Sequence, residues 1–195
     1  MPAFEISLCE TPAEFGQRFG PLNYRGEPWD LSHLDPFAFR CDLGFGREHT
    51  VLVLFSCHCF TRSFAWDVRP RHHIANDEIF SDGREERVLC PDRYELSRRL
   101  LGELVIGLPV RRITIADERR ANFLTVETTT GSGEHAVYAV FFMVEKDKSR
   151  KHRLLLRVQS AYTLSHGLTK RQKAAKKASL RSILRATVEG RTIRA

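Results

Sequence analysis

The segment Cys57-His58-Cys59 carries residue types that bind metals or transfer protons. On a strand, Cys57 and Cys59 would point to one side and His58 to the other, so one ion could not take all three. The residues that could complete a tetrahedral site are Cys41, His72, His73 and Cys90. The spacing is not that of structural zinc modules, and free cysteine is among the most buried residue types. We therefore expect two buried thiols, no metal and no other cofactor; the alternative is an ion held by both cysteines.

Nucleophilic and nucleotide-binding motifs are the next candidates. Cys90 directly precedes Pro91 at a predicted helix start, where a thiol pKa falls, but it lacks the local signature of a cysteine hydrolase. We interpret it as a buried cysteine at a strand end. The chain contains no P-loop, G-x-G-x-x-G, G-x-S-x-G or H-E-x-x-H motif. This argues against a nucleotide-hydrolysing motor and against a serine esterase.

The remaining candidate is acid–base cleavage of a polyanion without a metal ion. It needs a proton-transferring group, a cation that stabilises the phosphorane, and groups that hold a base. The predicted catalytic residues are His58, Arg93, Arg98, Ser160 and Tyr162. Ser160 and Tyr162 share one face of a predicted strand, and Arg157 lies on the other unless a bulge intervenes. The alternative roles are structural: His58 would be a hydrogen-bonded histidine, Tyr162 an aromatic residue at the rim of the sheet, and Arg98 a solvent-facing helix residue.

A second histidine lies in the loop that contains Asp30, Ser32, His33 and Asp35. An aspartate three residues before a histidine could orient its imidazole. The alternative, which we favour, is that these short polar side chains make turn hydrogen bonds.

Positive charge is concentrated after residue 165. The chain has a net charge of +7, and residues 166–195 hold nine Lys and Arg against one acidic residue, Glu189. Such a block attracts polyanions by its field and by counterion release. The residues predicted to bind nucleic acid, RNA in preference to DNA, are Lys170, Arg171, Lys173, Lys176, Lys177, Arg181 and Arg185. An acidic protein partner is the alternative.

The N-terminal half is predicted to contain few regular elements. Thr11-Pro12 begins a short helix that ends near Phe19. Residues 21–36 read as loop, and residues 37–43 and 50–60 as a hairpin. Residues 61–86 show no sustained periodicity and are predicted to be a lid or binding loop.

The C-terminal half has stronger patterns. A helix begins at Pro91 and ends near Pro109. The four strand-like runs that follow are residues 111–116, 121–130, 136–146 and 153–164. Their links are short and polar, so the strands should pair as an antiparallel meander. The third run is apolar on both faces, which predicts a buried central strand.

A final helix is expected from Thr169 to Val188. Its first half carries lysines and should project, whereas Leu180, Ile183 and Leu184 should dock. The predicted fold is therefore α+β: an antiparallel meander preceded by a helix, with an N-terminal hairpin and a basic C-terminal helix. We expect residues 1–165 to form one domain and residues 166–195 a basic helical extension.

Residues 91–164 are predicted to form a helix and then a meander, whose last strand contains Ser160 and Tyr162. This order resembles the barnase and RelE-type nuclease superfamily. The resemblance implies that RNA lies on the sheet and that His, Glu, Arg, Lys, Ser and Tyr side chains catalyse its cleavage. Arg157, Ser160 and Tyr162 match that composition. His135 and His152 read as turn residues, so His58 would have to join from the hairpin.

A second resemblance covers residues 24–37, 55–61, 90–94 and 157–162. These segments are similar to a set of small uncharacterised bacterial proteins, some of them prophage-borne. The similarity implies a bacterial, cytoplasmic setting. The absence of a signal peptide and the odd count of five cysteines favour the same compartment, and no apolar run approaches the length of a membrane span.

We predict a nucleic-acid-acting bacterial protein, with a metal-independent, toxin-like ribonuclease as the specific hypothesis. The alternative is a non-enzymatic module that binds nucleic acid or protein. A site that gathers His58, Arg93 and Tyr162 favours the first, and a scattered set favours the second.

Overall fold

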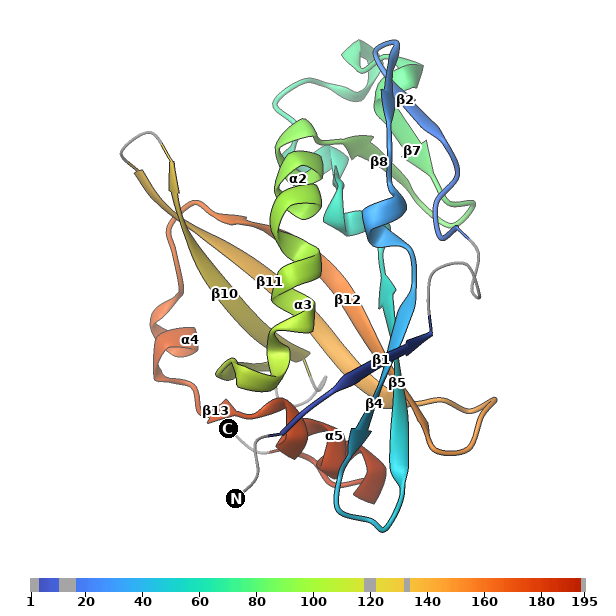
Figure 1. Ribbon diagram of the computed structural model, residues 1–195. Coiled ribbons are helices and arrows are strands. Elements are labelled where there is room, and N and C mark those ends of the chain that lie inside the picture. Colours follow the sequence, from blue (N-terminus) through green and yellow to red (C-terminus); the bar gives the residue numbers. More distant parts are fainter. Residues whose placement is uncertain (1–3, 11–16, 118–121, 132–133, 194–195) are drawn as a thin grey trace.

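A mixed eight-stranded sheet runs through the molecule in the order β1-β4-β5-β12-β11-β10-β9-β13 (Figure 1). The computed structural model describes residues 4–10, 17–117, 122–131 and 134–193. The helix predicted at Thr11 therefore lies largely outside the described residues. The strands are β1 (Ser7–Glu10), β4 (Phe37–Asp42), β5 (Glu48–Phe55), β9 (Ile113–Asp117), β10 (Asn122–Gly131), β11 (Glu134–Lys146), β12 (Arg153–Leu164) and β13 (Lys177–Ala178).

Antiparallel pairing dominates this sheet, and the predicted α+β class is confirmed. The β4–β5 hairpin and the β9–β10–β11–β12 meander form where the sequence predicts them. The exception is the parallel pair of β5 and β12, in which Thr50 lies opposite Arg153 and Phe55 opposite Val158. This pair joins the hairpin to the meander. It also makes β12 a central strand.

The core lies on one face of the meander. Tyr138, Val140 and Phe142 of β11 are fully buried there, whereas Phe141 and Met143 on the opposite face are only half-buried. The strand is central, as predicted, but its second face is buried only in part, with Ala139 fully buried and Phe141 and Met143 half-buried. That face leaves part of an aromatic ring accessible, and it becomes important for the site.

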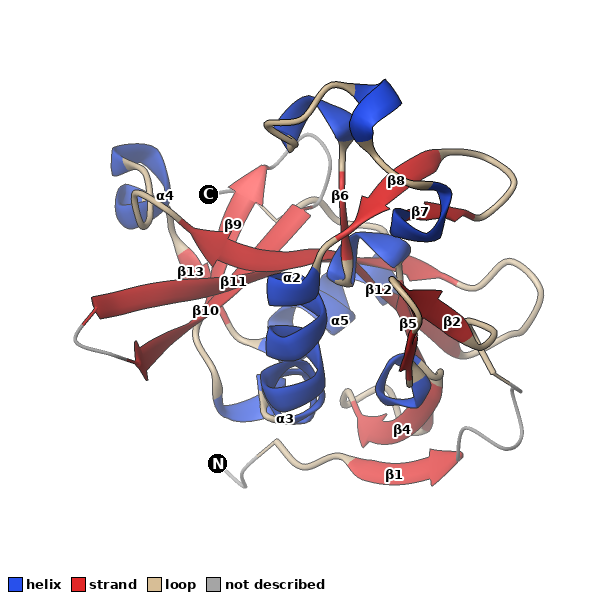
Figure 2. Cartoon of the chain, turned by 90° about the horizontal axis from the view of Figure 1, so that it is seen from above, coloured by secondary structure: helices blue, strands red, loops and turns tan. Residues whose placement is uncertain are grey.

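One helical segment crosses the sheet (Figures 1 and 2). It comprises α2 (Pro91–Leu96), a π-helical turn η6 (Ser97–Leu101) and α3 (Gly102–Ile106), followed by the 3₁₀ turn η7 (Leu108–Val110). Pro91 stands at the first helical position, where its missing N–H costs nothing. Leu101, Leu104 and Val105 lie along one side of this segment and are buried. No helix among the described residues is long and apolar enough to cross a membrane.

Two segments predicted as loops contain regular structure. Residues 21–36 form the hairpin of β2 (Leu22–Tyr24) and β3 (Glu27–Trp29) and the turn η1 (Ser32–Leu34). Residues 61–89 form a three-stranded sheet and three turns. These are β6 (Thr61–Arg62), β7 (Ile79–Ser81), β8 (Glu86–Leu89), η3 (Phe64–Trp66), η4 (Arg71–His73) and η5 (Asn76–Glu78). The elements are too short to give a periodic signal.

Ion pairs hold residues 62–78 in place. Arg69 binds Asp67 (Nε to Oδ1, 3.1 Å) and Glu78 (Nη2 to Oε2, 2.8 Å). Arg62 adds a 2.6 Å bond to Asp67, and Arg25 adds a 3.0 Å bond to Glu78. The side chains of Asp67 and Glu78 are 0% and 4% exposed. The bonds from Arg69 hold the pKa of both carboxyl groups below their usual values.

This network should make the protein sensitive to acid. A carboxyl group with a lowered folded-state pKa stabilises the fold fully above its unfolded pKa, and this stabilisation is lost as pH falls through the folded value. We expect the free energy of unfolding, measured by urea denaturation, to fall between about pH 5 and about pH 3. Glu78→Gln should flatten that dependence, whereas Asp77→Asn, at an exposed neighbour, should retain it. A wild-type profile in Glu78→Gln would contradict the prediction.

The C-terminal segment differs from the prediction of one long helix. Thr169 begins a helix, as predicted, and forms a capping box with Gln172, but α4 (Lys170–Ala174) ends after about one turn and a half. The chain then extends as β13, which pairs with the edge of β9, and Ser179 caps a new helix, α5 (Leu180–Glu189). Pairing with β9 satisfies backbone groups that a continuous projecting helix would leave at the sheet edge.

The part of the chain after residue 165 is therefore tied to the body. Leu180, Ile183 and Leu184 are fully buried in the same core cluster as the strands of the large sheet. Docking of this apolar face is as predicted, but residues 166–195 do not project as one extension. The side chains of Lys173, Lys176 and Lys177 are exposed, so the charge lies on a surface that is anchored at both ends.

Candidate active site

A 3₁₀ turn presents His58 to solvent. β5 ends at Phe55, and Ser56 caps the turn η2 (Cys57–Cys59) by accepting a hydrogen bond from the His58 backbone N–H (3.1 Å). The predicted strand does not extend to residue 60. Both cysteines are buried, as predicted, because the turn directs them inward, while the His58 side chain stays 35% exposed.

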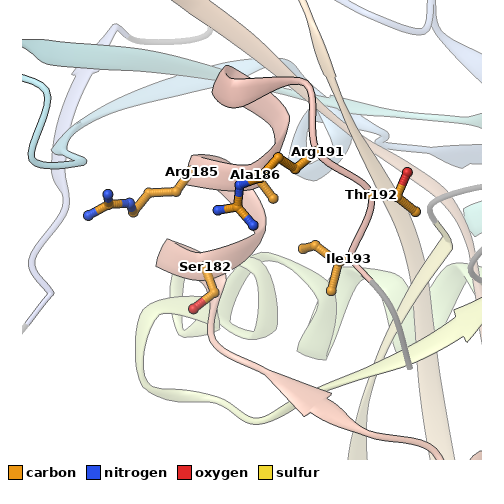
Figure 3. A pocket seen from close by; sticks show the side chains of 6 residues that line it. All are labelled: Ser182, Arg185, Ala186, Arg191, Thr192 and Ile193. Atoms are coloured by element: carbon orange, nitrogen blue, oxygen red, sulfur yellow. The ribbon is translucent and has the colours of Figure 1, made fainter.

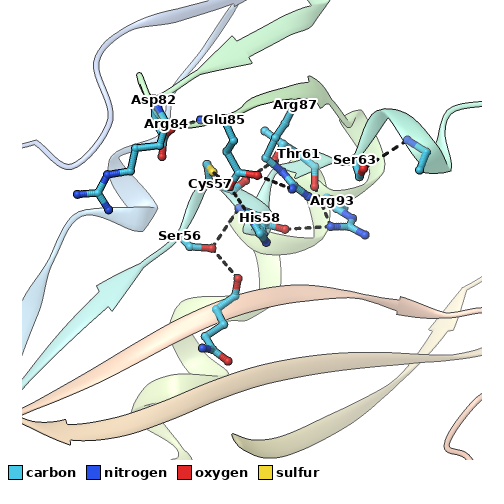
Figure 4. Close-up of polar contacts among 12 residues, drawn as sticks. Ser56, Cys57, His58, Thr61, Ser63, Asp82, Arg84, Glu85, Arg87 and Arg93 are labelled. Atoms are coloured by element: carbon cyan, nitrogen blue, oxygen red, sulfur yellow. Dashed lines mark hydrogen bonds and ion pairs between the residues drawn. The ribbon is translucent and has the colours of Figure 1, made fainter. Parts of the chain in front are cut away.

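Glu85 holds the imidazole from the turn before β8. The Nε2 atom of His58 lies 2.7 Å from Oε1 of Glu85, and Nη1 of Arg87 donates to Oε2 of Glu85 (3.1 Å; Figure 4). Arg87 is itself fixed by donating from Nε to Thr61 Oγ1 (2.8 Å). The bond from His58 is the main cause that lowers the pKa of the Glu85 carboxyl group. Glu85 therefore stays ionised and accepts a hydrogen bond from Nε2–H of His58.

This pairing fixes the chemistry of the ring. In neutral histidine one nitrogen donates and the other accepts, and the hydrogen bond of one decides the role of the other. With Nε2–H directed to Glu85, Nδ1 of His58 is the basic nitrogen. Among the described residues it has no hydrogen-bond partner. The arrangement is that of a carboxylate-oriented general base.

Arg93 supplies a positive charge next to the backbone of the turn that carries His58. Its Nη1 donates to the backbone carbonyls of His58 (3.1 Å) and Thr61 (2.7 Å), and its guanidinium lies 4.7 Å from the ring centroid of Tyr162. Burial lowers the pKa of Arg93. Within the described part of the chain, Arg93 has no carboxylate within ion-pair distance. A half-buried cation held only by carbonyls and a ring is well placed to receive an anion.

Tyr162 belongs to an aromatic pair on the sheet. It stacks on Phe141 with ring centroids 5.5 Å apart and an interplanar angle of 19°. Both side chains lie on the face of the sheet opposite the buried residues of β11. Ser160 lies across from Phe141 in the β11–β12 register and is half-buried on the same face as Tyr162.

A bulge changes the position of Arg157. The β11–β12 register shifts between Phe141 and Phe142, which leaves Gln159 as the extra residue. Simple alternation placed Arg157 on the face opposite Tyr162; the bulge brings it to the same face, and burial of Val158 and Ala161 follows this pattern. Its Nε donates to Glu145 Oε1 (2.6 Å), so its charge is already paired.

The structure thus gathers His58, Arg93 and Tyr162, with Ser160 on the neighbouring strand position. Arg98 is separate: it is exposed, pairs with Glu95 (3.2 Å) and lies over Tyr94. Arg98 follows Arg93 by five residues along the helical segment, so the two side chains point in different directions. Glu85 and Arg87 were not predicted, because both lie in or beside the stretch without periodicity. The candidate active site is His58, Glu85, Arg87, Arg93 and Tyr162.

The second histidine has a structural role. His33 Nε2 contacts Ser97 Oγ at 2.8 Å, and burial lowers the pKa of His33. Asp30 Oδ1 accepts from the backbone N–H of Ser32 at 2.9 Å, which is the favoured turn hydrogen bond. Ser97 is fully buried inside the helical segment.

Cys57, His58 and Glu85 have donor atoms within 4.8 Å of one another, which is close enough to share a metal ion. Two features oppose a cation there. Burial raises the pKa of the Cys57 thiol to about 11, whereas a metal requires the thiolate. In addition, the guanidinium of Arg87 already binds the other oxygen of Glu85. These features favour the hydrogen-bonded pair.

The predicted nucleic-acid-binding residues fall into two groups. Lys170, Arg171, Lys173, Lys176 and Lys177 are exposed on α4, on β13 and in the link between them. Arg181 and Arg185 are half-buried on α5 and reach Gly44 in the β4–β5 turn. This turn precedes β5 and His58 follows it, so the length of the strand, roughly 25 Å, separates Arg181 and Arg185 from the candidate active site.

A surface pocket of about 480 Å³ lies along α5 (Figure 3). It is lined by Ser182, Arg185, Ala186, Arg191, Thr192 and Ile193. Glu189 pairs with both Arg185 (3.7 Å) and Arg191 near this pocket. None of the candidate active-site residues lines it.

These features define an α+β protein in which a histidine–glutamate pair lies in the turns next to a mixed sheet, and an arginine of the helical segment lies over an aromatic ring of that sheet. The chain belongs to the YjaZ family, whose sequence profile matches residues 21–188, a range that includes the whole candidate active site. Protein YjaZ of Escherichia coli (strain K12) is 29% identical over 122 residues, which is 60% of this chain and 62% of that relative. The chain therefore matches less than two thirds of the relative's length. No solved structure matches the chain significantly. The resemblance to barnase and RelE-type nucleases stays a prediction.

Proposed function

We propose that this protein acts on nucleic acid as a metal-independent ribonuclease, with the candidate active site as its catalytic centre. The observation that carries the proposal is the His58–Glu85 pair, 2.7 Å apart, beside a half-buried Arg93 that has no carboxylate partner among the described residues. A general base next to a free cation suits a reaction at a phosphodiester. The proposal rests on this geometry and on the charge of the chain.

RNA fits the site better than DNA because RNA carries its own nucleophile. Nδ1 of His58 would take the proton of a 2′-hydroxyl, whose oxygen attacks the adjacent phosphorus. The bond from phosphorus to the 5′ oxygen then breaks, and that oxygen takes a proton from water. Arg93 would stabilise the charge that develops on the phosphoryl oxygens. DNA lacks the 2′-hydroxyl, so it should bind without being cleaved.

The Phe141–Tyr162 pair would hold a base. Both rings are half-buried, and stacking of a base on an aromatic side chain contributes about 1–3 kcal/mol in single-stranded complexes. β12 continues from Tyr162 to Leu164, and α4 follows after a short link. A strand bound at Tyr162 could therefore continue toward the lysines of α4.

The test is to incubate the purified full chain with labelled RNA and DNA of one sequence, with and without EDTA. We expect both to bind, RNA alone to be cleaved, and EDTA to have no effect. Cleavage that EDTA abolishes would contradict the metal-independent mechanism. Binding of both nucleic acids without cleavage would support the non-enzymatic module, and binding of neither would refute both.

Replacing the aromatic platform should weaken binding of single-stranded RNA. Tyr162→Leu keeps an apolar side chain but removes the ring, so we expect the dissociation constant to rise about 5- to 150-fold, the equivalent of one stacked base. Fluorescence anisotropy with a short RNA measures it. Tyr24→Leu, at an aromatic residue that stacks on Trp29 elsewhere, is the control and should bind like wild type. Equal loss in both variants would contradict the role of Tyr162.

The lysines near α4 should act through charge alone. Changing Lys173, Lys176 and Lys177 together to Gln should lower the dependence of log K on log salt by about 2–3, because each neutralised phosphate contributes a slope of about 0.7–0.9. The melting temperature should stay nearly unchanged, because all three side chains are exposed. An unchanged salt slope would show that this surface does not contact nucleic acid.

A further inference from the structure

Two arginines converge on the β4–β5 turn. Arg181 and Arg185 lie four residues apart on α5 and therefore extend from the same side of the helix. A Cβ placed on Gly44 would lie 3.4 Å from Arg185 Nη1 and 3.6 Å from Arg181 Nη2. Both terminal nitrogens are thus within reach of a single tetrahedral oxyanion. Figure 1 shows α5 beside the turn that joins β4 and β5.

The charge of this arginine pair is poorly compensated. Arg181 is half-buried, its Nε is buried without a hydrogen-bond partner, and within the described residues it has no ion pair. Arg185 has a 3.7 Å contact with Glu189. The carboxylate of Asp42, in the same turn, accepts a 2.7 Å hydrogen bond from the Gly44 N–H. A half-buried charge without a counter-ion costs free energy, so an anion that binds Arg181 Nη2 and Arg185 Nη1 beside Gly44 would stabilise the fold.

The turn is shaped to leave the space open. Gly44 has a φ of +80°, a left-handed conformation that favours glycine, and it places no side chain between the two guanidinium groups. Phe45 packs under Arg185, with the guanidinium 5.1 Å from the ring centroid, and so limits where this arginine can move. In Figure 3 the Arg185 side chain points away from Thr192 and Arg191.

We propose that Arg181, Arg185 and the Gly44 turn form a binding site for a phosphate-class oxyanion. Planar guanidinium groups match the oxygens of phosphate in geometry and charge. The site lies at the other end of β5 from His58, so it is separate from the proposed ribonuclease centre and does not depend on that activity.

Thermal unfolding of the full chain tests the proposal, with inorganic phosphate or pyrophosphate added against chloride of equal ionic strength. A ligand that binds only the folded state at a hundred times its Kd should raise the melting temperature by about 5–10 °C for a chain of this size. The increase in melting temperature should level off at high phosphate concentration. The proposal would be overturned if phosphate raised the melting temperature of the wild-type protein no more than chloride does.

Three variants separate binding from folding. Arg181→Met and Arg185→Gln should lose the phosphate-dependent rise, and Arg99→Gln, at an exposed arginine of the helical segment, should keep it. Without phosphate, Arg181→Met should melt no lower than wild type, because an unpaired charge is replaced by an apolar chain of similar length. A phosphate-dependent rise that persists in both Arg181→Met and Arg185→Gln would overturn the site.

A second titration, with RNA, tests whether the site binds free phosphate or the phosphates of a nucleic-acid backbone. An oligonucleotide without terminal phosphates is titrated under the same conditions. Stabilisation by inorganic phosphate that is lost in Arg181→Met supports the site as proposed. Stabilisation by RNA alone, lost in the same variant, would assign the arginine pair to a nucleic-acid interface and overturn the oxyanion site.

Discussion

His58→Gln is expected to lower the rate of RNA cleavage by about 10²–10⁴-fold, the usual contribution of a positioned general base. Glutamine keeps a polar side chain of similar reach but cannot take a proton. Arg93 is held by the backbone carbonyl of His58, not by its side chain, so the substitution should leave the cation in place. Single-turnover cleavage measures the rate, and RNA affinity should change little.

Two further variants make this prediction specific. Glu85→Gln should slow cleavage less than His58→Gln, because the imidazole remains but loses the carboxylate that fixes its tautomer. His33→Gln alters another half-buried histidine and should cleave at the wild-type rate. Full cleavage by His58→Gln would remove His58 from the mechanism, and equal loss in His33→Gln would point to a folding defect.

Truncation in the last helix is expected to cost far more stability than changes at the neighbouring lysines. Leu184 is fully buried against the main core, so Leu184→Ala should lower the free energy of unfolding by about 2–5 kcal/mol. Chemical denaturation monitored by circular dichroism measures the difference. The lysine-to-glutamine triple variant is the matched control in the same segment and should unfold at the wild-type denaturant concentration.

The opposite result has a clear meaning. A Leu184→Ala protein that unfolds like wild type would show that α5 detaches from the sheet in solution. A triple lysine variant that loses stability would show that β13 depends on its side chains, and not only on backbone pairing with β9.

The parts of the fold that the sequence predicted are those with local signals. Alternating residues with turn residues between them located β4 and β5, and short polar links located the meander. Thr169 correctly marked the start of a helix, but no local feature indicated that the helix would stop after Ala174, because the cause is a hydrogen-bonding edge on β9. Elements of two or three residues, such as β6 and η4, are too short for periodicity to detect.

The candidate active site was predictable by residue type more than by geometry. His58, Arg93 and Tyr162 were predicted because metal-free cleavage of RNA needs a proton-transferring group, a cation and a group that holds a base, and the structure brings them together. Glu85 was missed because nothing near it in sequence pairs it with His58. A single bulge at Gln159 changed the position of Arg157. Such register shifts depend on packing between strands.

The parallel pairing of β5 with β12 has a consequence for how the chain folds. Ser56 and Gln159, at the end of this pair, are separated by 103 residues, and β5 has only β4 as a neighbour until β12 arrives. Closing so long a loop costs conformational entropy before any contact repays it, and proteins rich in such contacts fold slowly. During synthesis the apolar edge of β5 would stay open while the following hundred residues are made. The nascent chain should therefore aggregate more readily than the finished protein, and it should benefit from a chaperone that covers that edge.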